Sequence, residues 1–150
     1  MVMIYPDAKS KTSLTDGESF QEFVRKKFLE FGIPIDYYKT SREQYAIGES
    51  VQGIEVKLDN WCSISGRLSI EIAEKTRREN FAYVPSGIYR EDNTWLYVQG
   101  NEKVLFVFAK SMLRLLHRTG RYQEKTEPTL KSFYLPVKDA TKYAAKVIYP

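Results

Sequence analysis

Hydrophobic residues recur at helical spacing in one stretch near the start of the chain. They fall three or four residues apart, at Phe20, Phe23, Val24, Phe28 and Phe31. This spacing places them on one side of an α-helix. Thr15 or Asp16 is suited to cap the first turn, and Gly32 is suited to end the last one. The pattern therefore predicts a helix over residues 17–31.

Most of the remaining chain has the pattern of β-strands. Six stretches combine apolar runs or alternation with turn residues at their ends, and they are residues 33–39, 44–49, 53–59, 67–74, 95–99 and 104–109. The short connections among the first three predict antiparallel pairing. Residues 110–118 predict a short helix closed by Gly120, and residues 133–137 and 142–148 each predict a further short element. One helix followed mostly by strands predicts an α/β (α+β) fold, a sheet with helices against it.

Composition indicates a folded protein with one domain. Of its 150 residues, 43% are hydrophobic and 14% aromatic, which is enough to bury a core. We expect a single domain over residues 1–150, with an irregular leader at residues 1–13. The net charge of +4 and the pI near 9.0 favour an acidic partner such as nucleic acid.

The rare residue types exclude several kinds of site. The single cysteine, Cys62, excludes an internal disulfide framework and a cysteine-based zinc cluster. The single histidine, His117, excludes a multi-histidine metal site and is expected to be structural or exposed. No apolar run reaches transmembrane length and the N-terminus lacks a signal-peptide core, so we expect a cytoplasmic protein without a membrane partner.

Two carboxylates and a lysine fall within nine residues, in the phrase GESVQGIEVK. Alternate side chains of a strand share a face, so Glu55 and Lys57 point the same way while Ile54, Val56 and Leu58 take the buried face. Gly53, beside Gln52, suits a tight turn before this strand. A reversal centred on Gln52 places Glu49 opposite Glu55 on the neighbouring strand. Such a cluster suits a metal ion and a phosphate, although an ordinary ion-paired hairpin has the same pattern.

In this context the chain resembles the PD-(D/E)XK nuclease superfamily, the restriction-endonuclease-like fold. The core of that family is a helix that carries an acid, then a hairpin with an acid on its first strand and acid-x-lysine on its second. The predicted helix, Glu49 and the Glu55-Val56-Lys57 triplet follow in that order, and the resemblance covers residues 17–59. The longer phrase QYAIGES-VQGIEVKLD … LSIEIAEK … VPSGIYR also resembles a small group of phage-type nuclease-like proteins. The resemblance implies a central mixed sheet flanked by helices.

The function that this resemblance implies is that of a divalent-metal-dependent DNA endonuclease, which hydrolyses phosphodiester bonds. Glu49, Glu55 and the backbone carbonyl of Val56 are the implied ligands of Mg²⁺ or Mn²⁺, hard cations that prefer oxygen. Lys57 is implied to orient or stabilise the attacking hydroxide. Glu71, opposite the apolar side chains of its strand, is a candidate extra ligand. The substrate is expected to be DNA, with RNA left open. A homodimer is a further option, since many such nucleases cut both strands.

Two positions depart from the family pattern. The usual Pro-Asp is replaced by Gly48-Glu49, so the first ligand is a longer carboxylate. The acid on the helix is ambiguous among Glu18, Gln21 and Glu22. The apolar face puts both glutamates on the far side, whereas Gln21 borders the buried face. A glutamine there would orient a water molecule without adding charge, which leaves the number of metal ions open.

Each candidate also has a purely structural interpretation. A solvent-facing ion-paired hairpin explains the acids and lysine of the phrase above, and Glu71 with Lys75 is more simply a solvated pair. Trp95 is expected in the core. Three basic groups, at residues 25–27, 75–78 and 114–121, suit contacts with phosphates, but charge runs are more often solvated faces. The competing function is a non-catalytic nucleic-acid- or protein-binding module that keeps the same fold.

Overall fold

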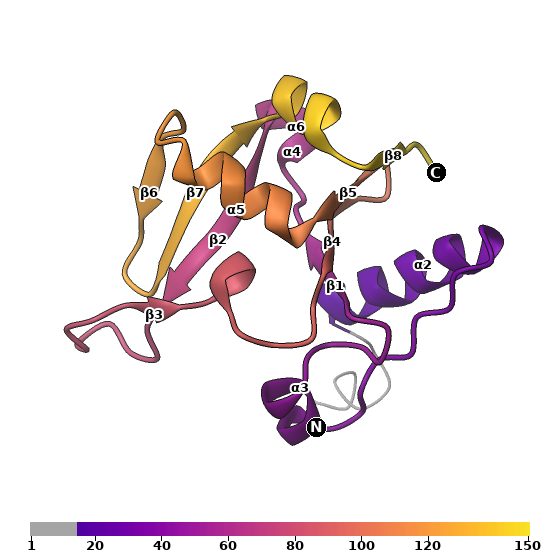
Figure 1. Ribbon diagram of the computed structural model, residues 1–150, viewed down its shortest axis with the longest axis horizontal. Coiled ribbons are helices and arrows are strands. Elements are labelled where there is room, and N and C mark those ends of the chain that lie inside the picture. The colour runs from indigo at the N-terminus through magenta and orange to yellow at the C-terminus, as the bar shows by residue number, and fades with distance from the viewer. Residues whose placement is uncertain (1–14) are drawn as a thin grey trace, which may run out of the picture.

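The computed structural model describes residues 15–150 as a mixed α+β protein with two four-stranded sheets (Figure 1). The helices are α2 (Asp16–Glu30), α3 (Ser41–Ala46), α4 (Cys62–Ser65), the 3₁₀ helix η1 (Gly87–Tyr89), α5 (Lys110–Arg118) and α6 (Val137–Tyr143). The strands are β1 (Ile54–Leu58), β2 (Arg67–Glu74), β3 (Val84–Pro85), β4 (Leu96–Asn101), β5 (Val104–Ala109), β6 (Glu124–Thr126), β7 (Leu130–Pro136) and β8 (Lys146–Ile148). The predicted α/β (α+β) class is confirmed, and the leader predicted for residues 1–13 lies outside the described residues. None of the helices in the described part of the chain is long and apolar enough to cross a membrane.

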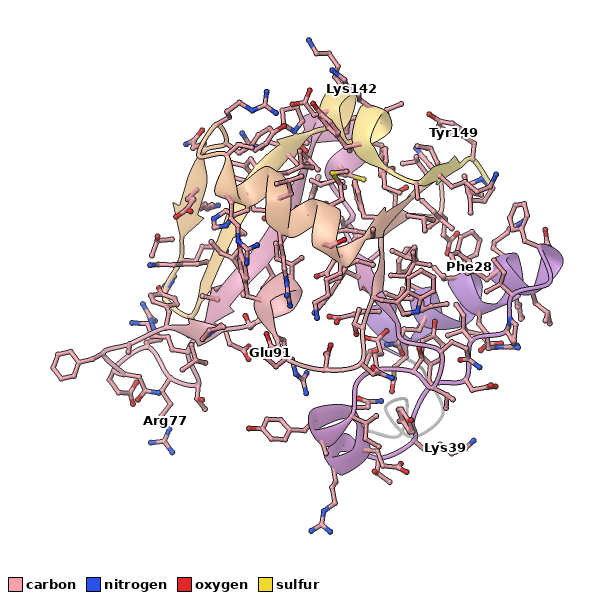
Figure 2. The ribbon with its side chains drawn as sticks, viewed as in Figure 1. Phe28, Lys39, Arg77, Glu91, Lys142 and Tyr149 are labelled. Atoms are coloured by element: carbon pink, nitrogen blue, oxygen red, sulfur yellow. The ribbon has the colours of Figure 1, made fainter. Side chains whose placement is uncertain are left out.

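Helix α2 confirms the helix predicted over residues 17–31. Thr15 caps it reciprocally with Glu18, because the Thr15 hydroxyl accepts the Glu18 N–H and the Glu18 carboxylate accepts the Thr15 N–H. Phe20, Val24 and Phe28 are buried, and each such burial stabilises the fold by about 1.5–3 kcal/mol. Side chains from α2 fill the space between the helix and the neighbouring sheet (Figure 2).

The mixed sheet has the strand order β1-β4-β5-β8, with β1 parallel to β4 and the other neighbours antiparallel. One face packs against α2 through Ile54, Val56 and Val98, among others. Because side chains alternate along a strand, Glu55 and Lys57 are directed to the opposite face. Strand β1 has a sheet neighbour on one side only, so the backbone groups along its other edge are not paired with another strand.

The opposite face of the mixed sheet packs against the second sheet. This sheet has the order β3-β2-β7-β6 and is antiparallel throughout. The larger core lies between the two, and its buried members include Leu68, Ile70, Tyr97, Phe106, Phe108, Leu113, Leu116, Phe133 and Leu135. Helix α5 contributes two of these residues and lies beside both sheets (Figure 1). The face that carries Glu55 and Lys57 is therefore turned toward β2.

Several local predictions are wrong. Residues 44–49 do not form a strand, because Thr40 and Glu43 form a capping box that begins helix α3. Residues 33–39 are extended but make only an isolated bridge, Tyr37 with Ser50, so no antiparallel run precedes β1. Trp95 was expected in the core, but 61% of its surface is exposed. It directly precedes β4, which begins at Leu96. The element predicted over residues 142–148 is divided between the end of α6 and the short strand β8.

Candidate functional site

Side chains take the place of a neighbouring strand along the open edge of β1. The Ser50 hydroxyl accepts the Ile54 N–H (2.9 Å) and donates to the Ile54 carbonyl (2.8 Å). One residue earlier in the chain, the Glu49 carboxylate accepts the Val56 N–H at 2.9 Å. The N–H and C=O of Ile54 both point to this edge, so by the alternation of the strand the carbonyl of Val56 points there too. Glu49 and the Val56 carbonyl, two of the predicted ligands, thus share one edge.

The predicted turn is present, but the predicted hairpin is not. The Gly53 N–H donates to the Ser50 carbonyl, and Gly53 has a φ of +75° that favours glycine. A Cβ at Gly53 would lie only 2.7 Å from the Trp95 ring, so a side chain has no room there. Glu49 therefore approaches β1 through its side chain and does not face Glu55 across a ladder.

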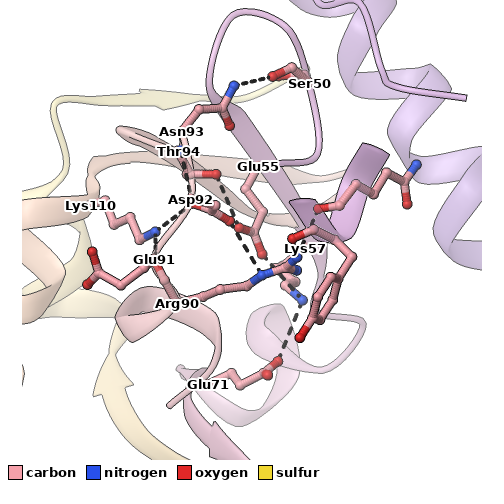
Figure 3. Close-up of polar contacts among 12 residues, drawn as sticks. Ser50, Glu55, Lys57, Glu71, Arg90, Glu91, Asp92, Asn93, Thr94 and Lys110 are labelled. Atoms are coloured by element: carbon pink, nitrogen blue, oxygen red, sulfur yellow. Dashed lines mark hydrogen bonds and ion pairs between the residues drawn. The ribbon is translucent and has the colours of Figure 1, made fainter. Parts of the chain in front are cut away.

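Lys57 links two carboxylates from different sheets. Its Nζ lies 3.5 Å from Glu55 Oε2 on the same strand and 3.5 Å from Glu71 Oε1 on β2 (Figure 3). Glu71 thus joins the candidate site, and the alternative in which it pairs with Lys75 is wrong. Lys75 instead donates to the backbone carbonyls of Arg78 and Asn80.

Burial raises the pKa of both acids, Glu49 at the edge of β1 and Glu55 on its face. Burial, and after it the charge of Glu55, raise the pKa of Glu49 to about 7, although the Val56 N–H, Lys57 and Gln21 each act to lower it. Burial also raises the pKa of Glu55, against the attraction of Lys57. Burial would lower the pKa of Lys57, but the charges of Glu55, Glu71 and Glu49 keep it above its ordinary value. Three acids thus surround one lysine.

The two helix candidates lie in different places. Gln21 is close enough to Glu49 for its side-chain hydrogen bond to lower the pKa of that carboxyl, and its backbone carbonyl accepts the Tyr37 hydroxyl at 2.8 Å. Glu22 forms an ion pair with Arg25 at 2.6 Å on the partly exposed surface of α2. Glu18 is occupied in the cap of α2. Among the three, Gln21 is the residue that borders the site.

A second ion pair, which the sequence did not indicate, lies behind Glu55. Lys110 Nζ, buried at the start of α5, is 3.0 Å from Asp92 Oδ1 and donates to the Arg90 carbonyl at 2.8 Å (Figure 3). Asp92 raises the pKa of Glu55 and Lys110 lowers it. The Thr94 hydroxyl donates to Glu55 Oε1 at 3.4 Å. Asp92 stands within a turn signal, EDN, and nothing in that signal indicates a buried charge.

An open cleft of about 340 Å³ lies between the two sheets beside this cluster. It is lined by Lys57, Leu58, Asp59, Asn60, Trp61, Ser69, Glu71, Tyr97, Gln99, Leu130 and Ser132. The Gln99 amide donates to Asp59 Oδ2 (2.9 Å) and to the Ser69 carbonyl (2.8 Å), which fixes one wall. The cluster is therefore reachable from solvent, and Lys57 is itself 37% exposed.

The oxygen donors of this site are of the kind that binds a hard divalent cation, but they are few. No three His, Cys, Asp or Glu side chains between residues 15 and 150 are grouped as a ready-made metal cage. Glu49, Glu55 and the Val56 carbonyl nevertheless offer oxygen donors of the kind that Mg²⁺ and Mn²⁺ prefer. Mg²⁺ is commonly bound by one or two carboxylates, with water and substrate phosphate as its other ligands. Its charge would also relieve the repulsion between the two acids.

Comparisons of the chain with protein-family models, with curated proteins and with solved structures gave no match.

Proposed function

We propose that the protein is a divalent-metal-dependent endonuclease that hydrolyses phosphodiester bonds in DNA, on a restriction-endonuclease-like fold. The observation that carries this proposal is the pair of buried acids at β1, with Glu49 at the edge of the strand and Glu55 on its face. The pKa of both is raised by burial, and the charge of Glu55 helps to raise that of Glu49 to about 7. Folding tolerates such a pair at a cost, and a bound cation would offset that cost.

The residues have separate roles in this proposal. Glu49, Glu55 and the Val56 carbonyl would hold Mg²⁺ or Mn²⁺, which supplies charge stabilisation to the phosphate oxygens and a more acidic water. Glu71 is 3.5 Å from Lys57 and serves to position its ammonium group. Lys57, held from two sides, would orient the attacking hydroxide and stabilise the developing negative charge. Gln21 would orient Glu49 through its amide.

The basic residues would contribute to DNA binding unequally. In the first group, Arg25 is already paired with Glu22 on the surface of α2. In the third, Arg114 donates to the Ile88 carbonyl at 2.6 Å. The second group lies on the loop between β2 and β3, and Figure 2 shows Arg77 projecting there. This loop, which continues the strand of Glu71, is the basic segment best placed to contact phosphates beside the cleft.

The test is DNA cleavage in Mg²⁺ or Mn²⁺ by the Lys57→Ala variant. We expect cleavage to be abolished while the far-ultraviolet circular dichroism spectrum is unchanged. Lys103→Ala, which changes an exposed lysine in the β4–β5 turn, is the matched control and should cut at the normal rate. Unchanged cleavage by the Lys57 variant would contradict the proposed nuclease site. Sedimentation of the protein with DNA would test whether two copies act together.

The second candidate is a non-catalytic nucleic-acid- or protein-binding module. It is favoured by the glutamine at position 21 and by the lack of three grouped acidic, histidine or cysteine ligands within residues 15–150. Calorimetric titration with Mn²⁺ discriminates between the two. Binding that is lost in Glu55→Gln supports the nuclease, whereas Mn²⁺ binding that does not depend on Glu55 supports the module.

A further inference from the structure

Trp61 stands at the rim of the cleft that contains Lys57 and Glu71. Its surface is 68% exposed, although tryptophan is among the residues with most to gain from burial. An exposed indole beside a polar cleft is a surface on which a flat aromatic ligand can stack. Nucleic-acid bases stack on aromatic side chains in this way, whatever their sequence.

The backbone around Trp61 is held firmly. Cys62, the next residue, is buried in the main core and begins helix α4. The side-chain amide of Asn101 donates to Ser63 Oγ (2.6 Å) and to the Asp59 carbonyl (3.4 Å), which ties both flanks of Trp61 to the end of β4. The indole is thus presented by a fixed segment, so little ordering is needed when a ligand stacks on it.

One residue that lines the same cleft, Tyr97, has a buried polar atom with no partner. Tyr97 is fully buried, and its hydroxyl is one of two side-chain atoms in the described residues that are buried without a hydrogen bond, the other being Ser86 Oγ. Tyr97 lies beside Glu55 in the β1–β4 register, which places it next to the cluster of acids. Buried hydroxyls are normally paired, so this one points to a ligand group that would complete it.

We propose that the cleft holds one unpaired nucleotide of the substrate, with its base against Trp61 and its sugar–phosphate reaching Tyr97 and Lys57. The cleft volume of about 340 Å³ lies within the usual range of ligand pockets, roughly 300–1,000 Å³. Bases of an intact duplex are stacked on both faces and cannot occupy it. The inference rests on the proposed function for its phosphate position, and it assigns the substrate class as nucleic acid that is single-stranded where it is cut.

The two tryptophans of the chain allow a matched test. Trp95→Phe leaves Trp61 as the only indole, and Trp61→Phe leaves Trp95, which is 61% exposed and lies outside the cleft. Each variant is titrated in Mg²⁺ with three probes that resist hydrolysis. These are phosphorothioate octathymidylate, phosphorothioate octauridylate and a blunt phosphorothioate duplex. The first two separate DNA from RNA as the source of the nucleotide.

We expect a single-stranded probe to quench the emission of Trp61 and to leave that of Trp95 unchanged. Trp61→Ala should weaken binding of whichever octamer quenches Trp61 about tenfold, as measured by fluorescence anisotropy with a fluorescent label on that octamer. Tyr97→Phe should weaken it severalfold without loss of folded structure. Quenching of Trp61 by the duplex as strongly as by the octamers overturns the inference, and so does no quenching by either octamer.

Failure of this inference differs from failure of the nuclease assignment. A protein that cuts DNA through Lys57 but shows no quenching of Trp61 remains a nuclease without the nucleotide subsite. A protein that shows the quenching but cuts nothing keeps the subsite and is a binding module.

Discussion

The carboxylate of Glu49 accepts the backbone N–H of Val56 at 2.9 Å, and this bond fastens an acid from a turn to the strand that carries Glu55 and Lys57. Strand β1 has no sheet neighbour on this side, so the Glu49 side chain accepts the hydrogen bond that a neighbouring strand would otherwise accept. The bond also lowers the pKa of Glu49, but burial and Glu55 outweigh it. Folding therefore places Glu49 where its carboxyl holds a proton more tightly than it does in the unfolded chain.

Replacing Glu49 with glutamine should make the fold less sensitive to pH. The pKa of Glu49 rises from 4.5 to about 7 on folding, so the folded state binds a proton more tightly than the unfolded state between these values. Stability from this group is complete below pH 4.5 and is lost as the pH rises through 7. The loss is at most about 3 kcal/mol at pH 8.

Urea unfolding at pH 5 and pH 8 checks this expectation. Glu49→Gln keeps an oxygen for the Val56 N–H, so it should match the wild type at pH 5 and exceed its free energy of unfolding at pH 8. An equal difference between the two proteins at both pH values would show that Glu49 does not titrate near neutrality.

The affinity for a metal ion should depend on the same proton. A cation at Glu49 must displace the proton that the carboxyl holds below pH 7, so Mn²⁺ should bind about tenfold more weakly at pH 6 than at pH 8. Isothermal titration calorimetry measures this directly. In Glu49→Gln the affinity should be lower and nearly independent of pH over this range. A steep pH dependence that persists in the variant would assign the proton to another group.

Removing one partner of the Asp92–Lys110 ion pair should destabilise the fold more than removing the charge of both. Its side chains are only 2% and 5% exposed, so Lys110→Met leaves a buried carboxylate unpaired and should cost about 3–5 kcal/mol in the free energy of unfolding. The double variant with Asp92→Asn should recover much of this loss. The exposed pair Lys125–Glu127 offers a control, and Lys125→Met should change stability by less than about 1 kcal/mol.

Thermal unfolding of the four proteins gives the comparison. A Lys110 variant that is no less stable than the Lys125 variant would contradict a buried, coupled pair. The single Lys110 variant should also carry a higher pKa at Glu55, because Lys110 lowers that pKa in the intact protein and Asp92 raises it.

Local signals in the sequence were sufficient for some elements and insufficient for others. The regular spacing of the phenylalanines predicts α2, and alternation predicts β1 with Glu55 and Lys57 on one face. The same β-like composition misleads at residues 44–49, where a capping box at Thr40 and Glu43 favours a helix. That box follows the S/T-x-x-E rule, so the sequence contained the signal.

Contacts between distant segments had no such signal. Strand β1 pairs with β4, which starts 38 residues after β1 ends, and nothing local distinguishes this parallel partner from an adjacent strand. Glu71 was a candidate from its strand face, but its contact with Lys57 depends on how the two sheets pack. Likewise, Asp92 lies in the loop between η1 and β4, and it meets Lys110 at the start of α5 only in the folded chain. The order of Glu49 and Glu55 along the chain can be taken from the sequence. The charges that surround them can be known only from the tertiary structure.

Removing the hydroxyl of Tyr97 should leave the fold as stable as before, or slightly more stable. The hydroxyl is buried and has no hydrogen-bond partner, so Tyr97→Phe removes a desolvated group and breaks no bond. Tyr122→Phe is the matched control, because the Tyr122 hydroxyl donates to Asp139 at 2.7 Å and its loss should cost about 1 kcal/mol. Urea unfolding of both variants without ligand measures the contrast. A Tyr97 variant that loses as much stability as the Tyr122 variant would mean that the hydroxyl already has a structural partner. A stable variant that binds the octamer poorly would instead show that this hydroxyl is retained for a ligand.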